Sequence, residues 1–393
     1  MSDKAQVIGV SMVKFAKPGA NDPYEVMGAE AIRGALTDAG IDYREVQQAF
    51  AGYVYGDSTC GQRTVYSVGM TGIPVFNLNN YCASGSSALL LARQAVEAGI
   101  VECALAFGFE EMQPGALGSA FADRTSPVGW IHERRKELAP ELPDDAPRAI
   151  KAFGSAGWEY INRFGANPDI FARVAVKSRT HAAQNPYALF TKPLTVEQVM
   201  EAPQLFPYMT RFMACPPTCG AAAAVVVSKD FAKRHGITNG VEIIGQAMTT
   251  DTEATKENLI NLVGAEMTQR AAAQVYETAG VGPDEVDVVE LHDCFTPNEV
   301  ISYEGLGLCE EGGAEKFILN GDNTYGGRYV VNPSGGLMSK GHPLGATGLA
   351  QCTELVWHLR GTAGDRQVEN ARIALQHNIG LGGACVVTMY RSA

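Results

Sequence analysis

Short apolar runs alternate along the chain with stretches whose apolar residues recur at helical spacing. The runs "VIGVSM" (7–12) and "IIGQAM" (243–248) are typical of buried strands. Two further segments, 31–52 and 271–292, each start as an amphipathic helix, stop at a glycine, turn, and end in an apolar run. Strands that alternate with helices in this way predict doubly wound α/β units.

The same order of patterns occurs twice, which indicates an internal duplication. The stretch "CASGSSALL" (82–90) matches "HPLGATGLA" (342–350), with glycine in the fourth position of both. Residues 113–205 of the first copy have no counterpart in the second. The predicted organisation is a first half of residues 1–112 plus 206–240, an inserted loop domain of residues 113–205, and a second half of residues 241–393.

The duplication also predicts where the two copies meet. Halves related by a pseudo-twofold axis would bring the helix starts near Cys82 and His342 face to face. The insertion, which is mixed in charge and rich in aromatic residues and proline, would cover the same rim as a binding lid. Its alternative role is a structural or dimer-forming appendage.

Composition and charge narrow the class of protein. Of the 393 residues, 46% are hydrophobic and 19% charged, which suits a folded protein with a large core. A net charge of −12 disfavours a general nucleic-acid surface. We find no uncharged apolar stretch of about 18 residues and no signal peptide, so we expect a cytoplasmic protein without a membrane span. Nine cysteines without a secretory signal argue against a disulfide framework.

Cys82 and His342 are the leading candidates for chemistry. Cys82 stands in a turn of small residues directly before an apolar helix, where unpaired backbone N–H groups favour a thiolate. We therefore expect a lowered pKa. His342, in a loop with five glycines and two prolines over 332–348, would supply the base that such a nucleophile needs. The alternatives are packing for the thiol and turn support for the histidine.

A second pair follows the apolar run "VDVVEL" (286–291). His292 and Cys294 would lie at the carboxyl end of a strand, where α/β folds place ligands. There they suit an oxyanion donor and a proton carrier. The alternative is a capped turn with Cys294 buried.

Other candidates are weaker. Cys215 and Cys219 have the spacing of a metal pair, but no second pair completes four ligands, so we expect no metal. Glu110 and Glu111 do not have the spacing of a catalytic pair, and neither a Rossmann fingerprint nor a Walker loop is present. The cysteines expected to be structural are Cys60, Cys103, Cys309, Cys352 and Cys385.

These motifs together resemble the thiolases, most closely the sterol-carrier-protein-X type. The matching stretches include "NNYCASGSSAL", "ELHDCFTPNE" and "LQHNIGLGGACVVT", and they run through residues 52–63, 79–89, 290–299, 303–309, 321–352 and 375–388. The resemblance implies a five-layered αβαβα fold of two similar halves with an inserted loop domain. It also implies cleavage of a 3-ketoacyl-CoA by CoA, which yields a shortened acyl-CoA and acetyl-CoA, or propionyl-CoA from 2-methyl substrates.

The resemblance assigns roles to matching positions. Cys82 would attack the 3-keto carbon and carry the acyl group, and His342 would activate it. His292 would help form one oxyanion hole, and the backbone N–H groups of Cys82 and Gly380 a second. Many thiolases have a further catalytic cysteine in a Cys-x-Gly triplet, but here the triplet is 378–380 and begins with asparagine. Cys294 is then the replacement acid and base.

The resemblance also bears on ligands, partners and competing functions. CoA is the expected co-substrate, with no other cofactor, and Lys and Arg residues within 134–192 are candidate phosphate partners. A homodimer or homotetramer is expected. The alternatives are a retro-aldolase of the lipid-transfer-protein type, acting on side-chain hydroxyacyl-CoA, and a non-catalytic lipid carrier.

Overall fold

The computed structural model describes residues 4–115, 118, 121 and 123–392. Within these residues ten strands form one mixed sheet in the order β10-β9-β11-β12-β8-β1-β7-β4-β2-β3. The strands are β1 (Gln6–Met12), β2 (Gln48–Gly52), β3 (Val75–Leu78), β4 (Cys103–Glu110), β7 (Gly220–Val227), β8 (Val241–Thr249), β9 (Val288–Glu290), β10 (Val330–Val331), β11 (Ile373–Gly380) and β12 (Ala384–Arg391). A separate hairpin joins β5 (Gln204–Phe206) and β6 (Met209–Thr210).

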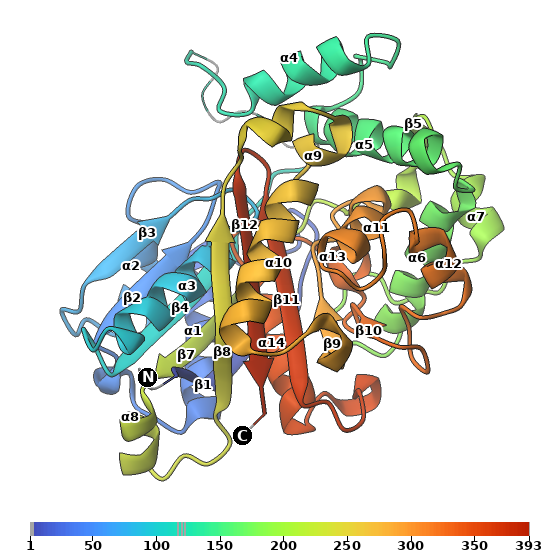
Figure 1. Cartoon of the computed structure of the whole chain (residues 1–393). Coiled ribbons are helices and arrows are strands. Elements are labelled where there is room, and N and C mark those ends of the chain that lie inside the picture. Colours follow the sequence, from blue (N-terminus) through green and yellow to red (C-terminus); the bar gives the residue numbers. More distant parts are fainter. Residues whose placement is uncertain (1–3, 116–117, 119–120, 122, 393) are drawn as a thin grey trace.

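Helices cover both faces of the sheet and fill the space between its halves (Figure 1). They are α1 (Tyr24–Ala39), α2 (Cys60–Tyr66), α3 (Ser84–Glu97), α4 (Gly129–Leu138), α5 (Arg148–Phe164), α6 (Asp169–Ala182), α7 (Val196–Met200), α8 (Lys229–Arg234), α9 (Leu259–Leu262), α10 (Ala265–Ala279), α11 (Thr296–Gly305), α12 (Ala314–Leu319), α13 (Gly336–Ser339) and α14 (Thr347–Arg360).

The strand order repeats on the two sides of the β1–β8 junction. Read outward from the junction, β1-β7-β4-β2-β3 corresponds to β8-β12-β11-β9-β10. The pairing directions also agree: β1–β7 and β8–β12 are antiparallel, whereas β2–β4 and β9–β11 are parallel. The halves meet where Val7 pairs with Val241. The topology thus has the form of a duplication, and the domain bounds given above remain a prediction.

Alternation along the strands separates the layers. In β4, Leu105 and Phe107 belong to the core beneath α1, whereas Ala104 and Ala106 belong to a central core with α3 and α14. Helix α14 contacts β1 and β7 of the first half as well as β9 and β11 of the second. The small alanine side chains let these helices pack closely between the halves. The predicted five-layered αβαβα class is confirmed.

The segment between β4 and β5 holds helices α4 to α7, which pack on the second half rather than on the first (Figure 1). Helices α5 and α6 contact α11, and α6 also contacts α12 and α13. The rings of Phe153 and Phe295 stack with centroids 5.0 Å apart. A Cβ on Gly157 would lie 2.8 Å from Pro297, so glycine permits the close approach of α5. The insertion therefore covers the helix that follows His292, and its role as a lid remains a prediction.

Candidate active site

Cys82 lies in a sharp turn between β3 and α3. Tyr81 has a left-handed backbone with φ of 52°, a conformation that costs a non-glycine residue about 1–2 kcal/mol. The Ser84 hydroxyl holds the turn, because it accepts from the Asn80 N–H (2.9 Å) and donates to the Tyr81 carbonyl (2.6 Å). Asn80 Nδ2 also donates to the Ser87 hydroxyl (2.9 Å). The thiol is thereby placed directly before the first turn of α3.

Cys82 is only 7% exposed. Burial raises its pKa well above the usual value, and the neighbouring Cys215 and Glu110 add to this effect. The expected lowering of the pKa is therefore wrong, because removing water from the thiolate outweighs the favourable helix start. Resting Cys82 is a neutral thiol, and a base must take its proton before it can attack.

His342 lies in the turn before α14, and its hydrogen bonds fix which ring nitrogen is basic. Its Nδ1 is 2.7 Å from the Thr347 hydroxyl, which itself donates to the Pro343 carbonyl (3.0 Å). Because the hydroxyl proton is committed, Nδ1 must be the donor, and Nε2 carries the lone pair. Nε2 is buried and has no partner among the described residues. Burial lowers the pKa of His342 to about 3, so the ring is a neutral base.

The structure brings Cys82, His292 and His342 together. Sγ of Cys82 and one ring nitrogen of each histidine lie within 4.8 Å of one another. The two imidazoles meet edge to face, with centroids 5.0 Å apart. Burial, with His342 and His377 nearby, lowers the pKa of His292 well below its usual value. A neutral thiol and two neutral imidazoles therefore converge, a donor set that Zn²⁺ also accepts.

Cys294 and Cys215 lie against this cluster. The Cys215 N–H donates to the Cys294 carbonyl (2.9 Å), and Pro217 bridges to His342. This segment thus contacts both the loop after β9, which carries His292, and the turn before α14, which carries His342. Burial raises the pKa of Cys294 well above its usual value, and the Cys215 and Cys82 thiols add to the effect, so Cys294 retains its proton.

Cys219 bonds to a different segment from Cys215. Its Sγ, directly before β7, accepts a hydrogen bond from the Met112 N–H at 3.2 Å. Sequence reasoning considered Cys215 only as half of a metal pair and missed its place at the cluster, because its contacts are to residues distant in sequence.

Gly380, the last residue of β11, lies against the Cys82 turn. A Cβ there would be 2.0 Å from the Asn80 carbonyl and 3.2 Å from the Ala83 nitrogen, so only glycine fits. The two backbone N–H groups of the predicted oxyanion hole therefore belong to segments in contact. Asn378, two residues earlier, has its Nδ2 3.0 Å from Nδ1 of His292.

Two family models match most of the chain: "Thiolase, N-terminal domain" over residues 6–207 and "Thiolase C-terminal domain-like" over residues 245–390. The chain belongs to the thiolase family. Sterol carrier protein 2 of Gallus gallus is 51% identical over 398 residues, which cover 99% of this chain and 72% of that protein.

Solved structures agree on the fold of this thiolase. The Ltp2-ChsH2(DUF35) aldolase matches with a TM-score of 0.83 at 22% identity, over 99% of this chain and 98% of that one. Human mitochondrial 3-ketoacyl-CoA thiolase matches with a TM-score of 0.72 at 17% identity, over 100% and 99%. At such identities the likeness shows the fold alone.

Two buried carboxyl groups hold the segments of the candidate site; sequence analysis missed Asp293 and considered Glu110 only as half of a catalytic pair. Asp293 accepts from the N–H groups of Leu337 (2.7 Å) and Met338 (3.3 Å) in α13. Glu110 accepts from the Gly345 N–H (2.9 Å), three residues after His342. Each partner is distant in sequence, so no local spacing reveals the bond. Burial raises the pKa of Asp293 to about 8, with Glu299 adding to the effect, and that of Glu110 to about 7.

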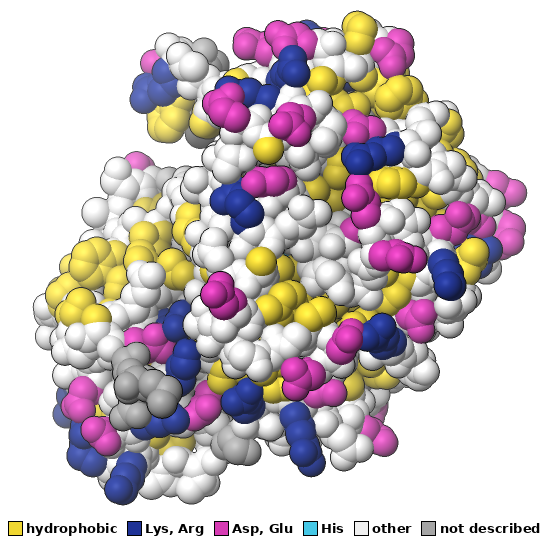
Figure 2. Space-filling view, viewed as in Figure 1, with side chains coloured by type: hydrophobic (Ala, Val, Ile, Leu, Met, Phe, Trp, Pro, Cys, Tyr) yellow, Lys and Arg dark blue, Asp and Glu magenta, His cyan; other side chains and the backbone are white. Residues whose placement is uncertain are grey.

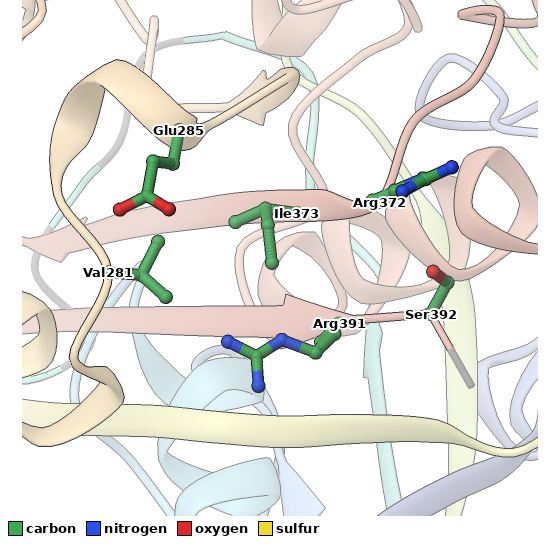
Figure 3. A pocket seen from close by; sticks show the side chains of 6 residues that line it. All are labelled: Val281, Glu285, Arg372, Ile373, Arg391 and Ser392. Atoms are coloured by element: carbon green, nitrogen blue, oxygen red, sulfur yellow. The ribbon is translucent and has the colours of Figure 1, made fainter.

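Two surface hollows differ in their relation to this cluster. One, of about 210 Å³, lies in the insertion and is lined by Gly129, His132, Glu133, Lys136, Arg148 and Lys151. The other, of about 540 Å³, is lined by Val281, Glu285, Arg372, Ile373, Arg391 and Ser392 (Figure 3). Ile373 begins β11 and Gly380 ends it, so the second hollow is roughly 23 Å from the cluster.

No helix within the described residues is long and apolar enough to cross a membrane.

Proposed function

We propose that this thiolase cleaves 3-ketoacyl-CoA with CoA through an acyl group carried on Cys82. His342 takes the proton of Cys82, and the sulfur attacks the 3-keto carbon. The C–C bond then breaks, leaving an acyl thioester on Cys82 and the enolate of acetyl-CoA, or of propionyl-CoA from a 2-methyl substrate. The CoA thiol then displaces the acyl group, which restores the Cys82 thiol. The degraded chains would be fatty, branched or steroid side chains.

The observation that carries this proposal is the convergence of a thiol, a basic nitrogen and a second imidazole. Cys82, His292 and His342 offer donor atoms within 4.8 Å of one another, and Nε2 of His342 has no hydrogen bond to any residue that the structure describes. A nucleophile beside a base with an oriented ring is the arrangement that covalent acyl transfer requires.

Cys294 would protonate the leaving enolate. Its raised pKa keeps the proton on sulfur in the resting site, as a general acid requires. His292 would donate to the oxyanion formed from the 3-keto oxygen, and the N–H groups of Cys82 and Gly380 would stabilise the oxyanion of the thioester step.

The cationic hollow of the insertion is our candidate for the CoA phosphates. Lys136, Arg148 and Lys151 line it. Burial raises the pKa of Tyr81, the residue before Cys82, and the positive charge of Arg148 opposes that rise. Replacing Arg148 with alanine should raise KM for CoA and leave kcat nearly unchanged. Replacing Arg173, which pairs with Asp169 on α6, is the matched control and should change neither.

A second copy of the chain is the proposed occupant of the exposed sheet edge. Strand β3 ends the sheet, and the exposed side chains of Tyr66, Met70 and Phe76 lie on or beside it. Figure 2 shows hydrophobic atoms gathered over this region. Edge strands with apolar neighbours tend to pair with another chain. Phe76→Lys should shift the mass measured by light scattering toward that of the monomer.

Intact-mass measurement tests the acyl-enzyme directly. The protein is incubated with a panel of 3-ketoacyl-CoAs in the absence of CoA, and each acyl group should add its mass to the chain. Cys82→Ser should show no such adduct. Cys385→Ser is the matched control, because that thiol is buried beside the Thr268 hydroxyl (3.7 Å) and should leave the adduct intact.

The likeness to the Ltp2-ChsH2(DUF35) aldolase makes retro-aldol cleavage the second candidate. That reaction would release a free aldehyde or ketone from a 3-hydroxyacyl-CoA without consuming CoA. Its detection, together with no adduct on Cys82 from any 3-ketoacyl-CoA, would replace our proposal. A lipid carrier would bind acyl chains and turn over neither substrate.

A further inference from the structure

Asn378 is fully buried in β11. By the resemblance described above, it stands at the first position of the triplet in which many thiolases have a catalytic cysteine. Its side chain bonds in two directions. Nδ2 is 3.0 Å from Nδ1 of His292, and Oδ1 accepts from the Ser86 hydroxyl (2.8 Å). The amide therefore links the start of α3 to an imidazole of the catalytic cluster.

The orientation of this amide follows from the bonds behind it. Gln376 Oε1 accepts from the Tyr390 hydroxyl, and its Nε2 donates to the Gly348 carbonyl (2.7 Å) and to Ser86 Oγ (2.9 Å). A carbonyl cannot donate, so Gln376 has one possible orientation. Since Ser86 Oγ accepts this hydrogen bond, its own hydroxyl hydrogen is available to donate to Oδ1 of Asn378. This leaves the NH₂ group of Asn378 to face His292.

An amide NH₂ group only donates, so Nδ1 of His292 must carry a lone pair. We propose that Asn378 is a positioning residue that holds His292 in the Nε2–H tautomer. His342 is in the opposite state, with Nδ1–H bonded to Thr347 and the lone pair on Nε2. The two rings therefore present one donor and one acceptor to the space beside Cys82.

The opposite tautomers suit the two tasks of the site. Nε2 of His342 accepts the proton of Cys82, while Nε2–H of His292 donates to the developing oxyanion. If His292 carried its proton on Nδ1, the lone pair of its Nε2 would face the oxyanion and repel it. This consequence rests on the proposed thiolysis, whereas the tautomer itself does not.

Nitrogen-15 NMR of protein labelled at histidine tests the tautomer without substrate. His292→Gln identifies the His292 signals by difference. In the parent protein Nδ1 should have the shift of a ring nitrogen with a lone pair, and Nε2 that of one with a proton. In Asn378→Asp the shift of Nδ1 should change to that of a nitrogen with a proton, because a carboxylate accepts a hydrogen bond where the amide donated one. Asn239→Asp adds the same charge at an exposed position and should leave both signals unchanged.

A protonated Nδ1 in the parent, or an unchanged Nδ1 in Asn378→Asp, would overturn the proposal. If that variant does not fold, Ser86→Ala replaces it: the amide loses the bond that orients it, and the His292 signals should divide between the two tautomers. Signals identical to those of the parent would also overturn the proposal.

Kinetics provide the second measurement. Loss of one oxyanion donor should lower kcat of Asn378→Asp by about 100-fold or more, with KM little changed. The titratable groups that face His292 are Cys82, His342 and His377. The pH profiles of kcat are therefore compared between the parent and Asn378→Asp, which both retain these three residues. If the parent itself lacks thiolysis, the proposed function fails while the NMR result still decides the tautomer.

Discussion

Replacing Glu110 with glutamine removes a bond that connects the two halves of the molecule. Its carboxylate, 1% exposed at the end of β4, accepts from the N–H groups of Tyr55 (2.8 Å), Val54 (3.1 Å) and Gly345 (2.9 Å). Glutamine has the same shape, but one oxygen becomes an NH₂ group. In either orientation that group faces at least one N–H, which leaves a buried donor unsatisfied and costs about 1–3 kcal/mol.

The effect of the substitution depends on pH. Burial raises the pKa of Glu110 from 4.5 to about 7, so folding favours its neutral form. The resulting stabilisation is complete below pH 4.5 and is lost as pH rises through 7, for a total of about 3 kcal/mol. Glutamine does not titrate. The variant should therefore be less stable by about 1–3 kcal/mol at pH 5, and the difference should vanish or reverse at pH 8.

Urea unfolding of parent and variant at pH 5 and pH 8 measures this difference, because the other titrating groups cancel between them. Glu257→Gln, at an exposed carboxyl, is the control. The difference between its free energy of unfolding and that of the parent should be the same at both pH values. The reasoning would be refuted if the loss of unfolding free energy in Glu110→Gln, relative to the parent, stayed constant or grew toward pH 8.

Three further variants test the packing and the chemistry. Gly348→Ala places a Cβ 2.1 Å from Ser86 Oγ and 2.4 Å from its nitrogen, so urea unfolding should show a loss of about 1–3 kcal/mol. Lys177→Met leaves the buried Glu299 carboxylate without its cation, and the same assay should show a loss of about 3–5 kcal/mol. Cys294→Ala should slow thiolysis by about 10²–10⁴-fold in a steady-state assay, and a smaller effect would exclude it as the acid.

Much of the architecture was predictable because the two copies show the same local order of apolar runs, amphipathic helices and glycines. Gly85 and Gly345 occupy the same position of the two copies, and in the structure a Cβ on Gly85 would lie 2.6 Å from the Gly345 carbonyl. The two turns predicted to face each other do so. Cys82 and His342 are consequently neighbours although 259 positions separate them.

The electrostatics of the site were not predictable from the same patterns. The expectation for Cys82 considered the helix start, a local feature, and omitted burial, which arises from segments across the whole chain. Glu110 and Asp293 bond to backbone groups more than 40 residues away. Such bonds leave no spacing in the sequence, because any residue can offer a backbone N–H.

The duplication also explains why the site depends on glycine. Each copy contributes a turn that precedes a central helix, and the candidate catalytic groups meet only if those turns touch through their backbones. A Cβ on Gly348 or Gly380 would lie within 2.1 Å of an oxygen atom from the opposite copy. Larger residues at these positions would separate Cys82 from His342 and His292 before they affected the chemistry itself. Close packing of the two copies and the convergence of Cys82, His292 and His342 are therefore one structural requirement.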